Sequence, residues 1–405
     1  MRATSFLRDG RWVAVGLLLA YYAVLGLAGP GAEFVARWRR AGVYAHPAPF
    51  VDLQVFPAAR ATVAGGGALY GPSVTDPMQR PYNYPRLWLT FMRFPADPVW
   101  FRALGCLLAV AATAVVLALW GRLSVGEGFF GGLLLCSPAF QLGLERGNTD
   151  LGMLALVGAG LWLAGEERRG RLAAALWWVA AILKLFPILA LGVWFEGPVR
   201  AWLRRVWLPL GFFAAYLAVS WRDLAPVLHN TGGGWVQSYG SEVLAATWSQ
   251  VRAFYGTSQP DALPFAGVGR WVAAAGVAWM LVRGWLANPT ATAPVPAMPA
   301  AERRALLGFR AGTLVYVATF LAGSSFDYRQ CFLLLTLPQL WAWRRAGQRL
   351  AVVALGAMFF SFGANYLLAG WPGFFLNETG GWLLLFVLTL LLARTWRRGV
   401  VAITP

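Results

Sequence analysis

Charged residues are scarce in this chain, and lysine and the acidic residues are the scarcest among them. Only 13% of the 405 residues are charged, about half the share of a soluble globular domain. Seventeen residues are acidic against 34 basic ones, and a single basic residue is a lysine, Lys184. Because 59% of the residues are hydrophobic, the balance excludes a disordered chain, a collagen and a nucleic-acid module. It is typical of a polytopic membrane protein.

Cysteine and histidine are also rare, which limits metal and redox chemistry. The three cysteines lie inside apolar runs, without metal-ligand spacing or a disulfide framework, and His46 and His229 are the only histidines. No phosphate-binding loop, dinucleotide-binding glycine motif, serine-hydrolase elbow or zinc-protease motif is present. We therefore expect neither a cofactor nor a bound metal, and no nucleic-acid partner.

Apolar runs long enough for membrane helices are abundant instead. A spanning helix needs about 20 mainly apolar residues, and no soluble domain interrupts the runs. They predict an all-α, polytopic integral membrane protein with 10–12 transmembrane or re-entrant helices and one domain over 1–405. The first run is interpreted as a retained helix rather than a signal peptide. The expected segments are 11–29, 98–120, 128–145, 148–164, 171–196, 202–221, 266–286, 305–322, 331–343, 350–369 and 381–396.

The arginines between these runs predict the orientation, because cytoplasmic loops carry an excess of basic residues. Arginines before the first run, around the linker 288–300, after 343 and at the C-terminus place those parts inside. The loops 31–97 and 222–265 then lie outside. We expect a multi-pass protein of a bacterial plasma or inner membrane, with its functional site on the extracytoplasmic face.

This orientation requires an even number of crossings between residues 97 and 222, where five apolar segments occur. Arginines flank 171–196 on both sides, and Lys184 and Pro187 interrupt it. The pattern favours a re-entrant hairpin there, which needs protein or water around its irregular backbone. A break at Gly147–Asn148 is the alternative.

Asp52 is the candidate catalytic residue of the first outer loop. Apolar residues at 53, 55, 56, 58 and 59 follow it, as in a helix lying along the membrane face. A carboxylate at that boundary is partly desolvated and suited to accept a proton. The alternative is that Asp52 only caps the helix.

Charged residues at membrane depth are further candidates, because their insertion costs at least about 2.5–3.5 kcal/mol. The ammonium of Lys184 can bind a phosphate, or it pairs with Asp150 or Glu145. In the turn 145–150, Arg146 is a candidate for phosphate and Asn148 and Asp150 for sugar hydroxyls. Helix capping by Asn148, with the charges as ordinary membrane-edge residues, explains the turn equally well.

Asp327 and Arg329 open another apolar segment. The guanidinium of Arg329 matches phosphate oxygens, although Asp327 can simply hold it in an ion pair. In the second outer loop, Trp235 and Gln237 combine a ring for a sugar face with an amide for hydroxyls. Tryptophan is also a common membrane anchor, and 22 tryptophans occur in the chain.

The order and spacing of several short motifs resemble glycosyltransferase family 87. This family contains polyprenol-phosphate-sugar-dependent enzymes of the C-type glycosyltransferase fold, which usually place a catalytic Asp or Glu in the first outer loop. Asp52 matches that residue, and Tyr84 becomes a candidate for sugar or acceptor binding. The motifs, spread mainly over 45–195, are Asp52-x-x-Val-Phe-x-x-Ala-Arg60, Gly65-Gly66, Leu69-Tyr70, Tyr84-Pro85, Arg146-Gly-Asn148 and Lys184-x-x-Pro187.

The resemblance implies an inverting membrane hexosyltransferase, with mannose as one candidate sugar. Its partners would be a polyprenyl-phosphate sugar donor, a lipid or glycan acceptor and membrane lipids. Asp52 would act as the base, while Lys184, Arg146 and Arg329 would meet the donor phosphate. The alternative functions are a transporter or flippase for a lipid-linked or anionic substrate and a non-catalytic scaffold.

Overall fold

The computed structural model describes residues 9–26, 32–196, 198–231, 237–247, 267–287, 298–368 and 371–397. Within these ranges the fold is all-α, as predicted, apart from one two-stranded antiparallel pairing that joins Ser238 to Phe326 and Tyr239 to Ser325. The elements are α2 (Arg11–Gly26), α3 (Ala32–Arg40), α4 (Val51–Ala64), α5 (Trp88–Phe91), α6 (Pro98–Trp120), α7 (Val125–Leu135), α8 (Pro138–Arg146), α9 (Thr149–Ala164), η1 (Glu167–Arg169), α10 (Gly170–Lys184), η2 (Phe186–Trp194), α11 (Val199–Asn230), β1 (Ser238–Tyr239), α13 (Val268–Leu286), α14 (Ala300–Leu321), β2 (Ser325–Phe326), η3 (Asp327–Thr336), α15 (Leu337–Arg345), α16 (Arg349–Leu367) and α17 (Trp371–Arg397).

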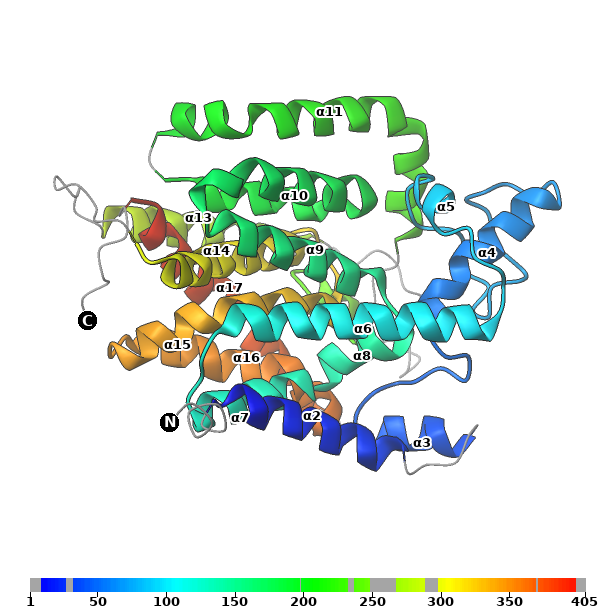
Figure 1. Cartoon of the computed structure of the whole chain (residues 1–405), viewed down its shortest axis with the longest axis horizontal. Coiled ribbons are helices and arrows are strands. Elements are labelled where there is room, and N and C mark those ends of the chain that lie inside the picture. The colour runs from blue at the N-terminus through cyan, green and yellow to red at the C-terminus, as the bar shows by residue number, and fades with distance from the viewer. Residues whose placement is uncertain are drawn as a thin grey trace.

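Three described helices are long and apolar enough to cross a membrane: Pro98–Trp120, Ala300–Leu321 and Pro372–Trp396. Most helices run side by side along the long axis of the molecule (Figure 1). α15 and the start of α14 lie at one end of this bundle, whereas α4 and α5 lie at the other. The composition and length of the three helices indicate association with a membrane.

Local sequence signals explain the bounds of α6. The side chain of Asp97 accepts a hydrogen bond from the amide of Val99, Pro98 occupies the first helical turn, and Gly121 ends the helix with φ 64°. Only 22% of its most apolar window is buried inside the protein. Side chains such as Leu107 therefore remain exposed, as lipid contact requires.

The expected span 128–145 is two helices instead of one. α7 ends at Leu135, and α8 starts at Pro138 after Ser137, whose hydroxyl accepts a hydrogen bond from the amide of Phe140. A capping serine followed by proline starts a new helix. The prediction of one uninterrupted helix was wrong, because this cap lies within the apolar run.

The segment 171–196 folds into a hairpin. Its first half is α10, and Leu185 (φ 55°, ψ −60°) ends that helix. The chain then returns as the 3₁₀ segment η2, and the ring of Trp194 lies 4.8 Å from that of Trp177 in the middle of α10. The two arms of the segment therefore lie side by side as a hairpin, and its re-entry into a membrane stays a prediction.

The segment expected as the second outer loop begins later than residue 222, because α11 continues to Asn230. The amide of Asn230 donates to the carbonyl oxygens of Tyr70 and Tyr82. These two hydrogen bonds attach the segment 31–97 to the end of α11. Most of the expected linker, residues 288–297, lies outside the described residues.

Candidate functional site

Asp52 occupies the second position of α4 and is only 4% exposed. The helix is preceded by Phe50 in the left-handed conformation (φ 51°), with no side-chain cap. The interpretation of Asp52 as a helix cap was therefore wrong. Its two carboxylate oxygens face outward from the helix, to Arg80 and to Asn148.

Arg80 holds one oxygen of Asp52 at 2.6 Å. The same guanidinium donates to both oxygens of Asp76, at 3.0 Å, and to the carbonyl oxygen of Val51. Burial disfavours the charged guanidinium, but the hydrogen bonds to Asp76 and the charge of Asp52 raise the pKa of Arg80 above its ordinary value. Asp52 thus faces a guanidinium that is held between two carboxylates.

Asn148 connects Asp52 to α9 and α10. Its amide nitrogen donates to the second oxygen of Asp52 at 2.6 Å. Its amide oxygen accepts from the backbone N–H of Asp150, which caps α9, and from Lys184 at 3.3 Å. The expected helix cap is therefore formed, and sugar binding by Asn148 stays a prediction.

Lys184 is the last residue of α10 and is 14% exposed. Its ammonium forms an ion pair with Asp150 at 2.6 Å and donates to the hydroxyl of Thr149 at 2.8 Å. It also lies over the ring of Tyr84, 5.1 Å from the ring centre. The ion pair with Asp150, one of the two partners expected from the sequence, is therefore formed.

Arg329 approaches the same carboxylate from η3. Its Nε lies 3.2 Å from the second oxygen of Asp150, and one terminal nitrogen donates to Ser325. Asp150 is 1% exposed, so two cations meet one buried carboxylate. The expectation that Asp327 holds Arg329 was wrong.

Asp327 instead lies in a separate polar group. It accepts hydrogen bonds from Gln330 and from the hydroxyl of Tyr366, and it is fully buried. Its backbone N–H donates to the carbonyl oxygen of Gln237, whose side chain accepts a hydrogen bond from Arg146 at 3.3 Å. The β1–β2 pairing thus places Arg146, Gln237 and Asp327 beside one another.

An aromatic cluster supports the loop side of the site. The ring of Phe56 stacks on Trp88 with 5.3 Å between ring centres and lies 5.0 Å from Tyr84. The indole N–H of Trp88 donates to the carbonyl oxygen of Leu183, next to Lys184. These contacts fix the loop and the end of α10 relative to each other. Trp235 lies outside the described residues.

Arg80, Asp76 and Thr149 contact this site but were not predicted from the sequence. Asp76 and Arg80 are four residues apart, a spacing compatible with an ion pair, and that is the one local signal for them. Among the described residues no group of three or more His, Cys, Asp or Glu side chains could hold a metal. Asn148 bridges Asp52 and Lys184.

We define the acid–base chain as the six side chains that these contacts connect. Along it, one cation pairs with one carboxylate, an amide follows, and two further cations then hold the second carboxylate between them. The members of the acid–base chain are Arg80, Asp52, Asn148, Lys184, Asp150 and Arg329.

Comparisons with family models, curated proteins and solved structures give no match.

Proposed function

We propose that this protein is a multi-pass membrane glycosyltransferase of the C-type fold that uses a polyprenyl-phosphate sugar. The transferred sugar is a hexose such as mannose, and the acceptor is a lipid or glycan. The resemblance of the sequence motifs to glycosyltransferase family 87 supports the donor class. The contact of Asp52 with Lys184 through Asn148 is the structural observation on which the proposal depends.

The placement of the arginines supports an extracytoplasmic site, and the membrane that we propose is a bacterial plasma membrane. Arg122, Arg304 and Arg345 lie where α6 ends, α14 begins and α15 ends, at the end of the bundle opposite α4 and α5. Basic residues favour the cytoplasmic side. The loop end, with α4 and Asp52, then faces outward.

The reaction is a single displacement with inversion at the anomeric carbon. The acceptor hydroxyl attacks this carbon and transfers its proton to the carboxylate of Asp52. The bond between the anomeric carbon and the phosphate oxygen breaks, and the electron pair stays on the polyprenyl phosphate. Lys184 and Arg329 face one carboxylate, Asp150, so their positive charge exceeds its negative charge and stabilises the leaving phosphate.

The polar contacts of Asp52 fit a positioned general base. Arg80 contacts one of its carboxylate oxygens, and Asn148 donates a hydrogen bond to the other. The acceptor hydroxyl replaces one of these contacts when it binds. A general base of this kind contributes about 10²–10⁴-fold to the rate.

The test is sugar release from radiolabelled polyprenyl-phosphate mannose and glucose by purified protein, with water as the default acceptor. We expect wild-type protein to release label and Asp52→Asn to lower the rate at least about 100-fold. Asp97→Asn is the matched control, because it removes a carboxylate at the same end of the bundle and asparagine still caps α6.

Two outcomes would overturn the proposal. One is full activity of Asp52→Asn. The other is movement of the labelled donor between leaflets of a vesicle without sugar release, which would indicate the flippase expected as the alternative from the sequence.

A further inference from the structure

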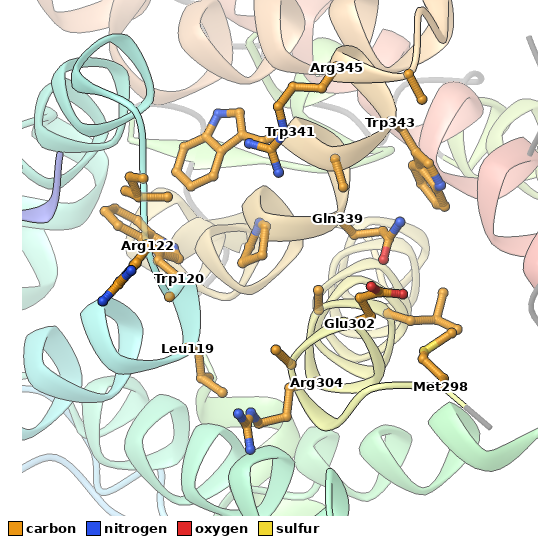
Figure 2. A pocket seen from close by; sticks show the side chains of 18 of the residues that line it. Leu119, Trp120, Arg122, Met298, Glu302, Arg304, Gln339, Trp341, Trp343 and Arg345 are labelled. Carbon is orange, nitrogen blue, oxygen red and sulfur yellow. The ribbon is translucent and has the colours of Figure 1, made fainter. Parts of the chain in front are cut away.

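A cavity of about 720 Å³ lies at the end of the bundle where α6 ends and α14 begins. Figure 2 shows Trp120 and Arg122 at the end of α6, Arg304 on α14, and Trp341 and Arg345 on α15 around it. The acid–base chain lies elsewhere, because Phe50, two residues before Asp52, packs against Gly105. Gly105 is 13 residues from Ala118, where α6 reaches the cavity, a distance of about 20 Å along a helix.

The cavity wall carries an excess of positive charge. Two of its arginines are already neutralised, because Arg11 pairs with Asp9 and Arg345 pairs with Glu127. Within the described part of the chain, Arg122 and Arg304 form no ion pair with a carboxylate. The charged residues of the wall are Arg11, Arg122, Arg304, Arg345, Arg394 and Glu302.

Aromatic rings form much of the remaining wall. The guanidinium of Arg304 stacks on Trp162 at 4.3 Å from the ring centre, which fixes its plane while its N–H groups stay available. Trp120 and Trp341 pack edge to face at 5.5 Å, and the amide of Gln339 lies between α14 and α15 (Figure 2). Amphipathic rings beside arginines are typical of the headgroup level of a bilayer.

We propose that this cavity binds the phosphate of an anionic glycerophospholipid headgroup from the cytoplasmic leaflet. Arg122 and Arg304 meet the phosphate oxygens, for which a guanidinium provides paired N–H donors. Gln339 is placed to contact headgroup hydroxyls. The volume lies within the range of about 300–1,000 Å³ for ligand pockets, and basic pockets between helices on the cytoplasmic side are a known site of lipid headgroups. The inference holds whether or not the protein transfers sugar.

The test is retention of lipid by the full-length protein in native mass spectrometry. Detergent-solubilised protein is titrated with phosphatidylglycerol, with zwitterionic phosphatidylcholine and with inorganic phosphate. We expect one phosphatidylglycerol molecule to bind at least about 10-fold more tightly than phosphatidylcholine. Two arginines near a headgroup contribute roughly 30-fold, so Arg122→Gln/Arg304→Gln should lose most of this preference.

Two further variants separate a specific site from general charge or misfolding. Arg39→Gln/Arg40→Gln removes the same charge from exposed positions of α3, at the other end of the bundle, and should bind as wild type does. Arg122→Lys/Arg304→Lys should keep the preference for the anionic lipid, because the charge remains.

Three outcomes overturn the inference. Equal retention of the two lipids by wild-type protein overturns it, and this result stands even if the glutamine variant fails to fold. An equal loss in the α3 control would assign the effect to overall charge. Displacement of phosphatidylglycerol by an equimolar amount of inorganic phosphate would assign the cavity to a free anion.

Discussion

Replacing Asp150 by asparagine is expected to destabilise the protein by about 3–5 kcal/mol, the usual cost of removing one partner of a buried ion pair. The ammonium of Lys184 lies 2.6 Å from one oxygen and Nε of Arg329 lies 3.2 Å from the other. At an effective dielectric constant of about 20, two unit charges at 2.6 Å attract by about 6 kcal/mol. Desolvation cancels part of this energy. Asparagine keeps the shape but leaves two cations facing each other.

A double-mutant cycle isolates the pair. Lys184→Met alone leaves Asp150 with Arg329 and should cost less, and the double variant should be about 1–3 kcal/mol more stable than the sum of the single losses predicts. Reversible unfolding of detergent-solubilised protein by dodecyl sulfate, followed by circular dichroism, measures the free energies. Strictly additive losses would refute the coupling. Glu33→Gln in the exposed pair with Arg37 is the control and should cost less than about 1 kcal/mol.

Three other predictions concern the loop, the first helix and the orientation. Gln79 is exposed with φ 53°, so Gln79→Gly should raise the free energy of unfolding by about 1 kcal/mol, and an unchanged value would contradict the strain. Burial opposes the charge of Asp9, but hydrogen bonds from Arg11 lower its pKa. The ionised carboxylate therefore stabilises the fold fully above its ordinary pKa, and this stabilisation is lost as acid protonates it. As the pH falls below about 4, Asp9→Asn should lose less of its free energy of unfolding than wild-type protein does. In a background without native cysteines, a membrane-impermeant maleimide on intact cells should label Arg39→Cys and not Ala346→Cys, and the reverse pattern would invert the orientation.

The helices were predictable where their signals are local. Asp97, Pro98 and Gly121 mark both ends of α6, and its bounds agree with the expected segment. The break at Ser137–Pro138 carries an equally local signal, but the apolar run around it obscured the signal. The hairpin was found through charge and parity, because Lys184 and Pro187 make a continuous crossing unfavourable.

Pairings within the site were harder to predict. The cap that Asn148 forms at the start of α9 followed from the sequence, because it depends on near neighbours only. Arg80 lies 28 residues from Asp52, and nothing in its local sequence identifies that partner. Arg329 is two residues from Asp327 but pairs with Asp150, 179 positions away, because tertiary packing rather than sequence distance selects the partner.

The pairing of Lys184 with Asp150 also joins the ends of two helices. Lys184 closes α10, and Asp150 lies in the first turn of α9. The last carbonyl groups of a helix carry partial negative charge and the first N–H groups carry partial positive charge, so each ion sits where its own helix favours it by about 0.3–1 kcal/mol. Exchanging the two residues would place each charge against a dipole of its own sign. The direction in which the chain runs through α9 and α10 therefore favours the carboxylate at the start of α9 and the ammonium at the end of α10.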